Sequence, residues 1–205
     1  MKIKEALTEL RKEKERKFNQ TVELIINLKG IDHKKDQVSF IVNLPHKFKE
    51  KKVCAFLTEK SKLVDSITEV QFAKYSEKKE LKKIVRNYDY FISAAKLMPK
   101  VATTFGKVLG PAGKMPSPQL GILPIENEQS IQAMLDKINS SLKIRLKEPS
   151  LKIPIGKQDM KDEDIIQNIN AVFHTAINAL PKKKENLKNT MIKFTMTKPY
   201  KVEID

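Results

Sequence analysis

The chain has 205 residues, enough for one large domain or two modest ones, each with its own core. Its 40 basic and 25 acidic residues give a net charge of +15, so we expect an anionic partner, with nucleic acid and anionic membrane as the main candidates. No apolar stretch approaches the length of a membrane-spanning helix, there is no signal peptide, and residues 1–15 alternate acidic and basic side chains. We therefore expect a cytoplasmic protein without a membrane partner.

The N-terminal segment contains a helix followed by two alternating strands. Residues 3–10 repeat apolar side chains at i, i+3, i+4 and i+7, which predicts a short amphipathic helix. Apolar and polar residues alternate over 22–28 and again over 38–44, with a turn at 30–36 between them and Pro45 at the end. Two strands of period two predict an antiparallel sheet with one face exposed to water.

Strands and helices alternate in the middle of the chain, beyond a charge run at 47–52. Continuous apolar runs at 53–57 and 90–95 are typical of strands covered on both faces. We also predict a helical stretch at 63–67, a short strand at 70–72, and helices at 77–87 and 131–138. This order indicates a small parallel sheet with helices on both faces, a Rossmann-like three-layer arrangement without the dinucleotide-binding fingerprint.

The alternating pattern returns near the C-terminus. Strands are predicted at 142–146, 151–155, 192–196 and 200–204, with a long helix at 162–180 and a basic connection at 182–188 among them. We therefore predict an α+β fold with an inserted α/β domain, in which a split, antiparallel-sheet outer domain comprises residues 1–46 plus 148–205 and the inner domain comprises residues 47–147. The outer domain carries 20 basic and 15 acidic residues and the inner domain 20 and 10, so both would attract a polyanion.

Cysteine and histidine are too sparse for a disulfide or a metal site. The single Cys54 lies in an apolar run and is interpreted as a buried hydrophobe. His33, His46 and His174 are scattered, and none has a second histidine or a carboxylate at metal-ligand spacing. We therefore predict no metal site and no cofactor.

Residues 105–118 concentrate glycine and proline. Because Gly adds conformational freedom and Pro removes a donor, we predict a shaped loop here, made basic by Lys107 and Lys114. A phosphate-binding P-loop would need Gly at 108 and Ser or Thr at 115, whereas the chain has Val108 and Met115. A nucleotide-dependent enzyme is thus an alternative that the spacing argues against, and we predict a protein that is not an enzyme.

The same stretch is the most recognisable part of the chain, because residues 106–118 read GKVLGPAGKMPSP. Other segments read KFNQTVEL (17–24), VNLPH (42–46), LMP (97–99), IGK (155–157) and TM (195–196). In this order they resemble the ribosomal protein L1 family, the proteins of the mobile lateral stalk of the large ribosomal subunit, and the similarity is greatest to archaeal members.

This resemblance implies a split α+β domain with an inserted α/β domain, which agrees with the periodicity. It also implies binding of structured large-subunit rRNA, chiefly through the split domain, and help in releasing deacylated tRNA from the ribosomal E site. Many members repress translation by binding a similar structure in their own mRNA. We therefore expect a constituent of the large subunit, monomeric when free, with stalk rRNA, E-site tRNA and its own mRNA as partners. A general nucleic-acid-binding module outside the ribosome is the alternative, which weak selectivity and a steep salt dependence would identify.

Carried over residue by residue, the resemblance places the RNA-binding residues on the first strand, after the returning strand and near the C-terminus. Thr21 and Glu23 lie on the polar face of the first strand, where side chains can reach ribose hydroxyls and base edges. Glu23 should face a hydroxyl or amino donor and is otherwise a solvated strand position, whereas Met196 is otherwise a core residue. The RNA-binding candidates are Lys17, Phe18, Gln20, Thr21, Glu23, Gly156, Lys157, Thr195, Met196, Thr197 and Lys198.

Two features are left open by the sequence. Members of the family typically have Gly directly after Thr-Met, but this chain has Thr197, which adds volume and a hydroxyl and favours negative φ. Either the local RNA contact is remodelled, or affinity is lower and Lys198 compensates through a phosphate. The family-signature loop has either a structural role or a secondary RNA contact through its lysines. Its residues are Gly106, Lys107, Gly110, Pro111, Gly113, Lys114, Met115 and Pro116.

Overall fold

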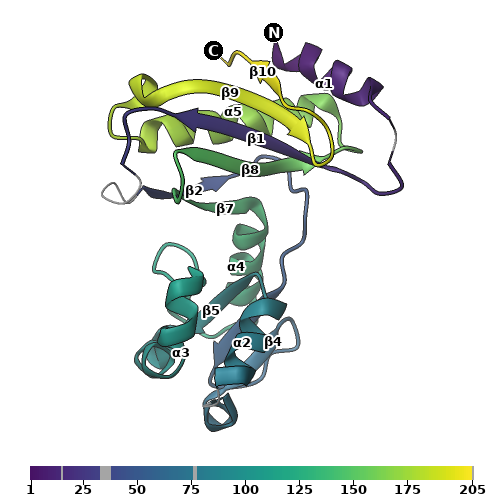
Figure 1. Cartoon of the computed structure of the whole chain (residues 1–205). Coiled ribbons are helices and arrows are strands. Elements are labelled where there is room, and N and C mark those ends of the chain that lie inside the picture. The colour runs from purple at the N-terminus through teal and green to yellow at the C-terminus, as the bar shows by residue number, and fades with distance from the viewer. Residues whose placement is uncertain (15, 33–37, 76–77, 205) are drawn as a thin grey trace. The chain divides into compact units, whose positions relative to one another are not determined.

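A computed structural model of the chain describes residues 1–14, 16–32, 38–75 and 78–204. Its contacts divide the chain into two compact units, which we call the outer and the inner unit. The outer unit comprises Met1–Lys49 and Ser140–Asp205, and the inner unit comprises Glu50–Asn139. The inner unit is therefore an insertion within the sequence of the outer unit, as the colours in Figure 1 show.

The outer unit is built on a four-stranded antiparallel sheet with the order β10-β9-β1-β8 (Figure 1). A separate antiparallel pair, β2 and β7, contacts helix α5. The elements are α1 (Ile3–Lys12), β1 (Thr21–Leu28), β2 (Ser39–Asn43), β7 (Ser141–Arg145), β8 (Ser150–Lys157), α5 (Asp162–Ala179), the 3-10 helix η3 (Lys183–Asn186), β9 (Leu187–Phe194) and β10 (Tyr200–Val202). Thus β1 and β2, which follow one another in the chain, belong to different sheets.

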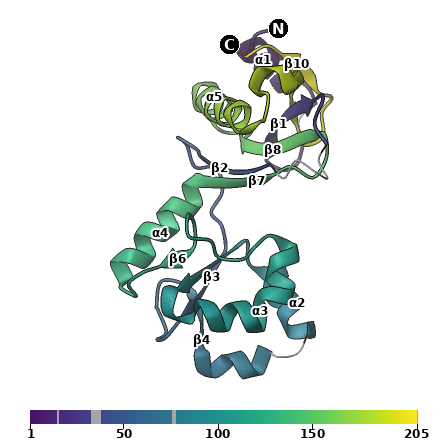
Figure 2. The ribbon, with the colours of Figure 1, turned by 90° about the vertical axis from the view of Figure 1, so that its left-hand side faces the viewer.

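Both helices of the outer unit cover the same face of the four-stranded sheet (Figure 2). On β1, Val22, Leu24 and Ile26 are fully buried and share one core with Leu7 of α1 and Ile169 of α5. The intervening side chains of β1 are only half-buried, because the pleat turns them to the other face. The sheet therefore has one packed face and one face without a covering helix among the described residues.

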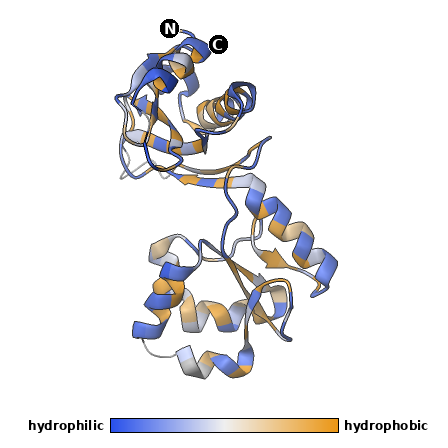
Figure 3. Cartoon of the chain, turned by 90° about the vertical axis from the view of Figure 1, so that its right-hand side faces the viewer, coloured by the Kyte–Doolittle hydropathy of each residue, from blue (hydrophilic) through white to orange (hydrophobic). Residues whose placement is uncertain are grey.

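The inner unit has a parallel sheet with the order β4-β3-β5-β6. Helices α2 and α3 pack together on one face through a core rich in phenylalanine, in which the ring centroids of Phe56 and Phe105 lie 4.7 Å apart. Figure 3 shows apolar residues along these strands. The elements are β3 (Val53–Leu57), β4 (Asp65–Thr68), η1 (Glu69–Tyr75), α2 (Lys78–Asn87), β5 (Tyr90–Ala94), η2 (Ala95–Leu97), α3 (Met98–Ala112), β6 (Ile122–Leu123) and α4 (Glu128–Ser140).

The predicted fold class is confirmed: an antiparallel sheet in one unit and a parallel sheet with helices in the other. The predicted turn at 30–36, the helix start at 77 and His33 lie wholly or partly outside the described residues. Within the described residues no helix is both long and apolar enough to cross a membrane. Burial raises the pKa of the Cys54 thiol to about 12, in agreement with its interpretation as a buried hydrophobe.

The prediction of a loop over 105–118 is wrong for its first half, because α3 runs through to Ala112. Val101, Phe105 and Leu109 form a buried stripe at helical spacing, and their packing outweighs the low helix propensity of the glycines between them. Pro111 lies in the last turn and lacks the N–H that would donate to the carbonyl of Lys107, a cost that the same packing also outweighs. The helix then ends at Gly113, whose φ of +70° is the left-handed conformation that glycine adopts readily.

The predicted helical stretch at 63–67 and strand at 70–72 are also wrong. The chain forms β4 at Asp65–Thr68 and then the 3-10 helix η1. Of the apolar residues there, Ile67 is buried while Val70 is 89% exposed, so the short run carried too little periodic signal to separate helix from strand.

Candidate nucleic-acid interface

The face of the outer sheet that no described helix covers carries polar and cationic side chains, which lie side by side on neighbouring strands. Its residues alternate with the buried ones on β1, and the strand register brings their partners alongside. We call it the open face. It comprises Thr21, Glu23, Ile25 and Asn27 of β1, Ser150, Lys152, Pro154 and Lys157 of β8, Asn189, Met191 and Lys193 of β9, and Lys201 of β10.

Positive charge dominates this open face. It carries four lysines, of which Lys152 and Lys201 are exposed, and one carboxylate, that of Glu23; just before β8, Glu148 pairs with Lys152 at 3.1 Å. The Glu23 carboxylate lies 3.9 Å from Lys193 Nζ, a loose pair that leaves both groups able to contact a ligand. The resulting potential suits a polyanion.

Side-chain hydrogen bonds give the face a fixed shape. Lys157 Nζ donates to Thr21 Oγ1 at 3.0 Å, and at the other end of β1 the Asn27 amide donates to Asn189 Oδ1 at 2.6 Å. Ser150 donates to Asn27 Oδ1 at 2.9 Å. Because these polar groups are positioned before any ligand arrives, less ordering is needed on binding.

Hydrogen bonds with Gln20 and Thr21, where β1 begins, hold Thr195 and Met196 in place. The Thr21 and Thr195 backbones are hydrogen-bonded, and the Thr21 N–H also donates to Thr195 Oγ1 at 3.1 Å. Gln20 is 2% exposed, and its Oε1 accepts the Met196 N–H at 3.1 Å. Its Nε2 donates to Gln158 Oε1 at 3.2 Å. One buried amide therefore links the segments that directly follow β8 and β9, the two strands paired with β1.

Two large apolar side chains are exposed at this end. Phe18 is 53% exposed and Met196 is 57% exposed, and Met196 lies in the turn after β9 rather than on an alternating strand. The alternative of Met196 as a core residue is therefore wrong. Nucleic acid bases stack on aromatic side chains such as that of Phe18, and an exposed methionine can add apolar contact beside them.

Thr197 closes the turn in which Met196 lies. Its Oγ1 accepts the Phe194 N–H at 2.9 Å and its backbone N–H donates to Phe194 O at 3.2 Å. Lys183 is the sole non-glycine residue with positive φ among those described, so Thr197 adopts its conformation without left-handed strain. The hydroxyl is thus used inside the turn, and the neighbouring Lys198 is exposed.

Gly156 lies on the packed face of the sheet. The register shifts between Val22 and Glu23, and this bulge turns Gly156 towards α5. A Cβ at Gly156 would lie 3.3 Å from Ile165 Cγ1 and equally close to Met160 Sδ, so the glycine allows helix and strand to approach closely. Lys17, by contrast, is exposed before β1.

Sequence reasoning missed Lys152, Lys193 and Lys201. Each sits at an alternate position of its own strand, but only the strand pairing shows that all three share a face with Thr21 and Glu23. Sequence reasoning also missed Arg11. Its guanidinium donates to Asp162 at 2.7 Å and to the carbonyls of Gln158 and Met160, which fixes the loop after Lys157.

The signature residues belong to the inner unit, whereas the open face belongs to the outer unit. Lys114 Nζ donates to Val85 O and Tyr88 O at 2.7 Å each, so its charge satisfies carbonyls at the end of α2. Met115 is packed against the inner core and Pro116 is buried. Lys107 remains exposed on α3.

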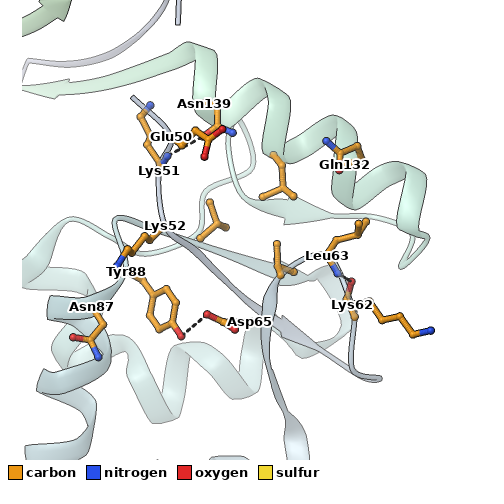
Figure 4. A pocket seen from close by; sticks show the side chains of 14 residues that line it. Glu50, Lys51, Lys52, Lys62, Leu63, Asp65, Asn87, Tyr88, Gln132 and Asn139 are labelled. Carbon is orange, nitrogen blue, oxygen red and sulfur yellow. Dashed lines mark hydrogen bonds between the residues drawn. The ribbon is translucent and has the colours of Figure 1, made fainter. Parts of the chain in front are cut away.

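The inner unit also has an open cavity of about 940 Å³ between α4 and the edge of the sheet where β3 and β5 begin (Figure 4). The Lys51 N–H donates to Asn139 Oδ1 at 3.0 Å and Lys51 Nζ donates to Ile138 O at 2.6 Å. Tyr88 donates to Asp65 at 2.9 Å, and burial together with this bond raises the pKa of Tyr88 to about 12. The described lining residues include no histidine or cysteine.

A two-unit α/β protein with a cationic, preorganised sheet face has the features expected of a basic nucleic-acid-binding protein. Comparison with known families is specific: residues 10–198 match the model of the Ribosomal protein L1p/L10e family. The chain belongs to this family. As a family of ribosomal structural proteins, it confirms the expectation of a protein that is not an enzyme.

Similar proteins carry the name large ribosomal subunit protein uL1. The protein of Thermococcus kodakarensis is 33% identical over 214 residues, covering 98% of this chain and 97% of that protein. The protein of Nanoarchaeum equitans is 33% identical over 196 residues, with 91% and 92% covered. The protein of Pyrobaculum islandicum is 34% identical over 209 residues, with 97% and 90% covered.

Proposed function

We propose that the chain is a constituent of the large ribosomal subunit and binds structured large-subunit rRNA at the mobile lateral stalk through the open face. Family membership and the names of the relatives support the ribosomal part of this proposal. The observation that carries the RNA part is the open face itself, with four lysines against one carboxylate on a sheet that no described helix covers on that side.

The two parts of the surface have different roles in this proposal. Lys152, Lys157, Lys193 and Lys201 neutralise phosphates, which positions the RNA without reading its sequence. Phe18 and Met196 stack on unpaired bases at the end of the sheet. Glu23 accepts a hydrogen bond from a ribose hydroxyl or a base amino group. Thr195 and Lys198 flank this contact from the turn.

The resemblance to L1 proteins extends the proposal further. Binding at the lateral stalk places the protein where deacylated tRNA leaves the E site, and its role there is to assist that release. A segment of its own mRNA with the fold of the rRNA site would compete for the same open face, and its occupation would repress translation.

The test is a binding titration of the full chain with the stalk rRNA fragment from its own organism and with a scrambled duplex of equal length, over a series of salt concentrations. We expect much tighter binding of the stalk fragment at every salt concentration. Equal binding to both RNAs that disappears together at high salt would refute the proposal and favour a general nucleic-acid-binding module.

Two sets of variants separate the roles. Replacing Lys152, Lys193 and Lys201 together by Gln removes about three phosphate contacts and should lower the slope of log Kobs against log salt by about 2 to 3. The matched control replaces Lys4, Lys161 and Lys182, which are exposed outside the open face, and should leave the slope unchanged.

The second set tests recognition of bases. Phe18→Ala should remove about 1 to 3 kcal/mol of stacking on the stalk fragment, with little effect on the duplex, and Met196→Ala should cause a smaller loss with the same selectivity. An equal loss on both RNAs would argue against base stacking at these positions.

A further inference from the structure

Helix α2 of the inner unit has a one-sided cationic surface. Lys79, Lys82, Lys83 and Arg86 are exposed, and we call them the α2 cationic face. Among the described residues of α2 there is one carboxylate, that of Glu80, which lies 2.7 Å from Lys83 Nζ. Over the length from Lys79 to Arg86 the helix rises about 10 Å, a distance matched by about three phosphates along one strand of a helical nucleic acid.

This charge arrangement does not serve the stability of the free protein. Lys79 lies three and four residues before Lys82 and Lys83, and Arg86 lies four and three residues after them. Like charges at these spacings are neighbours on a helix surface and repel one another. A bound polyanion would replace this repulsion by attraction, so the arrangement favours an anionic partner.

The excess of charge extends beyond α2. Residues 78–125 contain nine of the 15 basic residues of the inner unit but only two of its ten acidic residues. Helix α3 packs against α2 and exposes Lys107. A Cβ at Gly106 or Gly110 would meet nothing within 4 Å, so these two positions of α3 face open space.

The apolar side of α2 decides between RNA and a membrane as the partner. Leu81 is 6% exposed, and Ile84 and Val85 are packed against the inner core. A membrane-surface helix inserts its apolar side into the lipid, but here that side is already occupied. The exposed side of α2 therefore presents mainly charged groups to a partner, as in proteins that bind phosphates without reading the base sequence.

We propose that the α2 cationic face, together with Lys107, is a second RNA-binding surface that holds the phosphate backbone of the RNA and reads no bases. The proposal deepens the proposed function and rests on it for the class of partner. In this proposal the inner unit also contacts the RNA, in addition to the open face of the outer unit.

The experiment compares two triple variants of the full chain with the wild type, using the stalk rRNA fragment as the probe over a series of salt concentrations. The first variant carries Lys79→Gln, Lys82→Gln and Arg86→Gln. The control carries Lys52→Gln, Lys60→Gln and Lys62→Gln, which removes the same charge from exposed positions of the same unit, partly at the rim of the cavity. The α2 variant should lower the slope of log Kobs against log salt by about 2 to 3, and the control should leave it unchanged.

The outcomes distinguish this inference from the proposed function. If the α2 variant keeps the wild-type slope while the stalk fragment is still preferred over the scrambled duplex, the second surface is refuted and the proposed function stands. An equal fall in slope for both triples also refutes it, because the effect would then be one of net charge. If the α2 variant loses binding to phosphatidylserine vesicles but not to RNA, the surface belongs to a membrane and the assignment is overturned.

Discussion

The hydroxyl of Thr197 is predicted to stabilise the turn that presents Met196. In Thr197→Val, the Phe194 N–H loses its acceptor at 2.9 Å, which should cost about 1 kcal/mol of unfolding free energy. Thr197→Gly also frees the backbone of the unfolded state, which adds about 0.5 to 1 kcal/mol to the loss. Thr197→Ser keeps the hydroxyl and should stay close to the wild type. Urea unfolding monitored by circular dichroism measures the unfolding free energy of each of the three variants relative to the wild type.

The same series tests how Thr197 affects RNA binding. Because the hydroxyl is bonded within the turn, the side chain should position Met196 rather than obstruct the RNA. A loosened turn must be ordered on binding, and a cost of about 1 kcal/mol corresponds to a roughly fivefold loss of affinity for Thr197→Val and Thr197→Gly. Tighter binding by Thr197→Gly than by the wild type would refute this reasoning, because it would mean that the side chain blocks a close approach.

Three further predictions concern stability and reactivity. Gly121→Ala should destabilise the inner unit by about 2 to 4 kcal/mol, since the φ of Gly121 is +128° and the new Cβ would lie 2.9 Å from a backbone oxygen. Gly106→Ala, in open space on α3, should instead stabilise the inner unit by about 0.5 to 1 kcal/mol. Thermal unfolding that ranks the two variants in the opposite order would contradict this prediction. Asn168→Leu should cost about 3 kcal/mol in urea unfolding, because the fully buried amide bonds both the N–H and the carbonyl of His46; a loss below about 1 kcal/mol would show that water replaces these bonds. With its pKa raised to about 12, Cys54 should resist iodoacetamide at pH 8 in the native protein and react after unfolding, and rapid native alkylation followed by mass spectrometry would argue against its burial.

The sequence predicted those features that depend on local periodicity. Alternation alone placed Thr21 and Glu23 on the polar side of β1. The lysines that surround them could not be assigned to the same face, because Lys152 and Lys193 lie beside β1 only through pairings between distant parts of the chain. A change of one residue in the register would move every side chain of the paired strand to the opposite face of the sheet.

Residues that break helices in isolation were the main source of error. Gly106 and Pro111 predicted a loop, but the packing of Phe105 against the inner core holds the chain in a helix at those positions. Tertiary contacts of this kind do not appear in local propensity. The reverse case is Gly156, whose small size serves helix packing on the buried side of the sheet.

The hydrogen bond between Lys51 and Asn139 also bears on the order of folding. The pairing of β2 with β7 joins Asn43 to Ser141, 98 residues apart, and closing so long a flexible segment is entropically unfavourable and slow. Once the inner unit has folded, the bond from Lys51 to Asn139 holds its two ends together, so the flexible segment shrinks from 98 residues to the ten that separate Asn43 from Lys51 and Asn139 from Ser141. The inner unit should therefore fold first and act as the template on which the discontinuous outer unit closes.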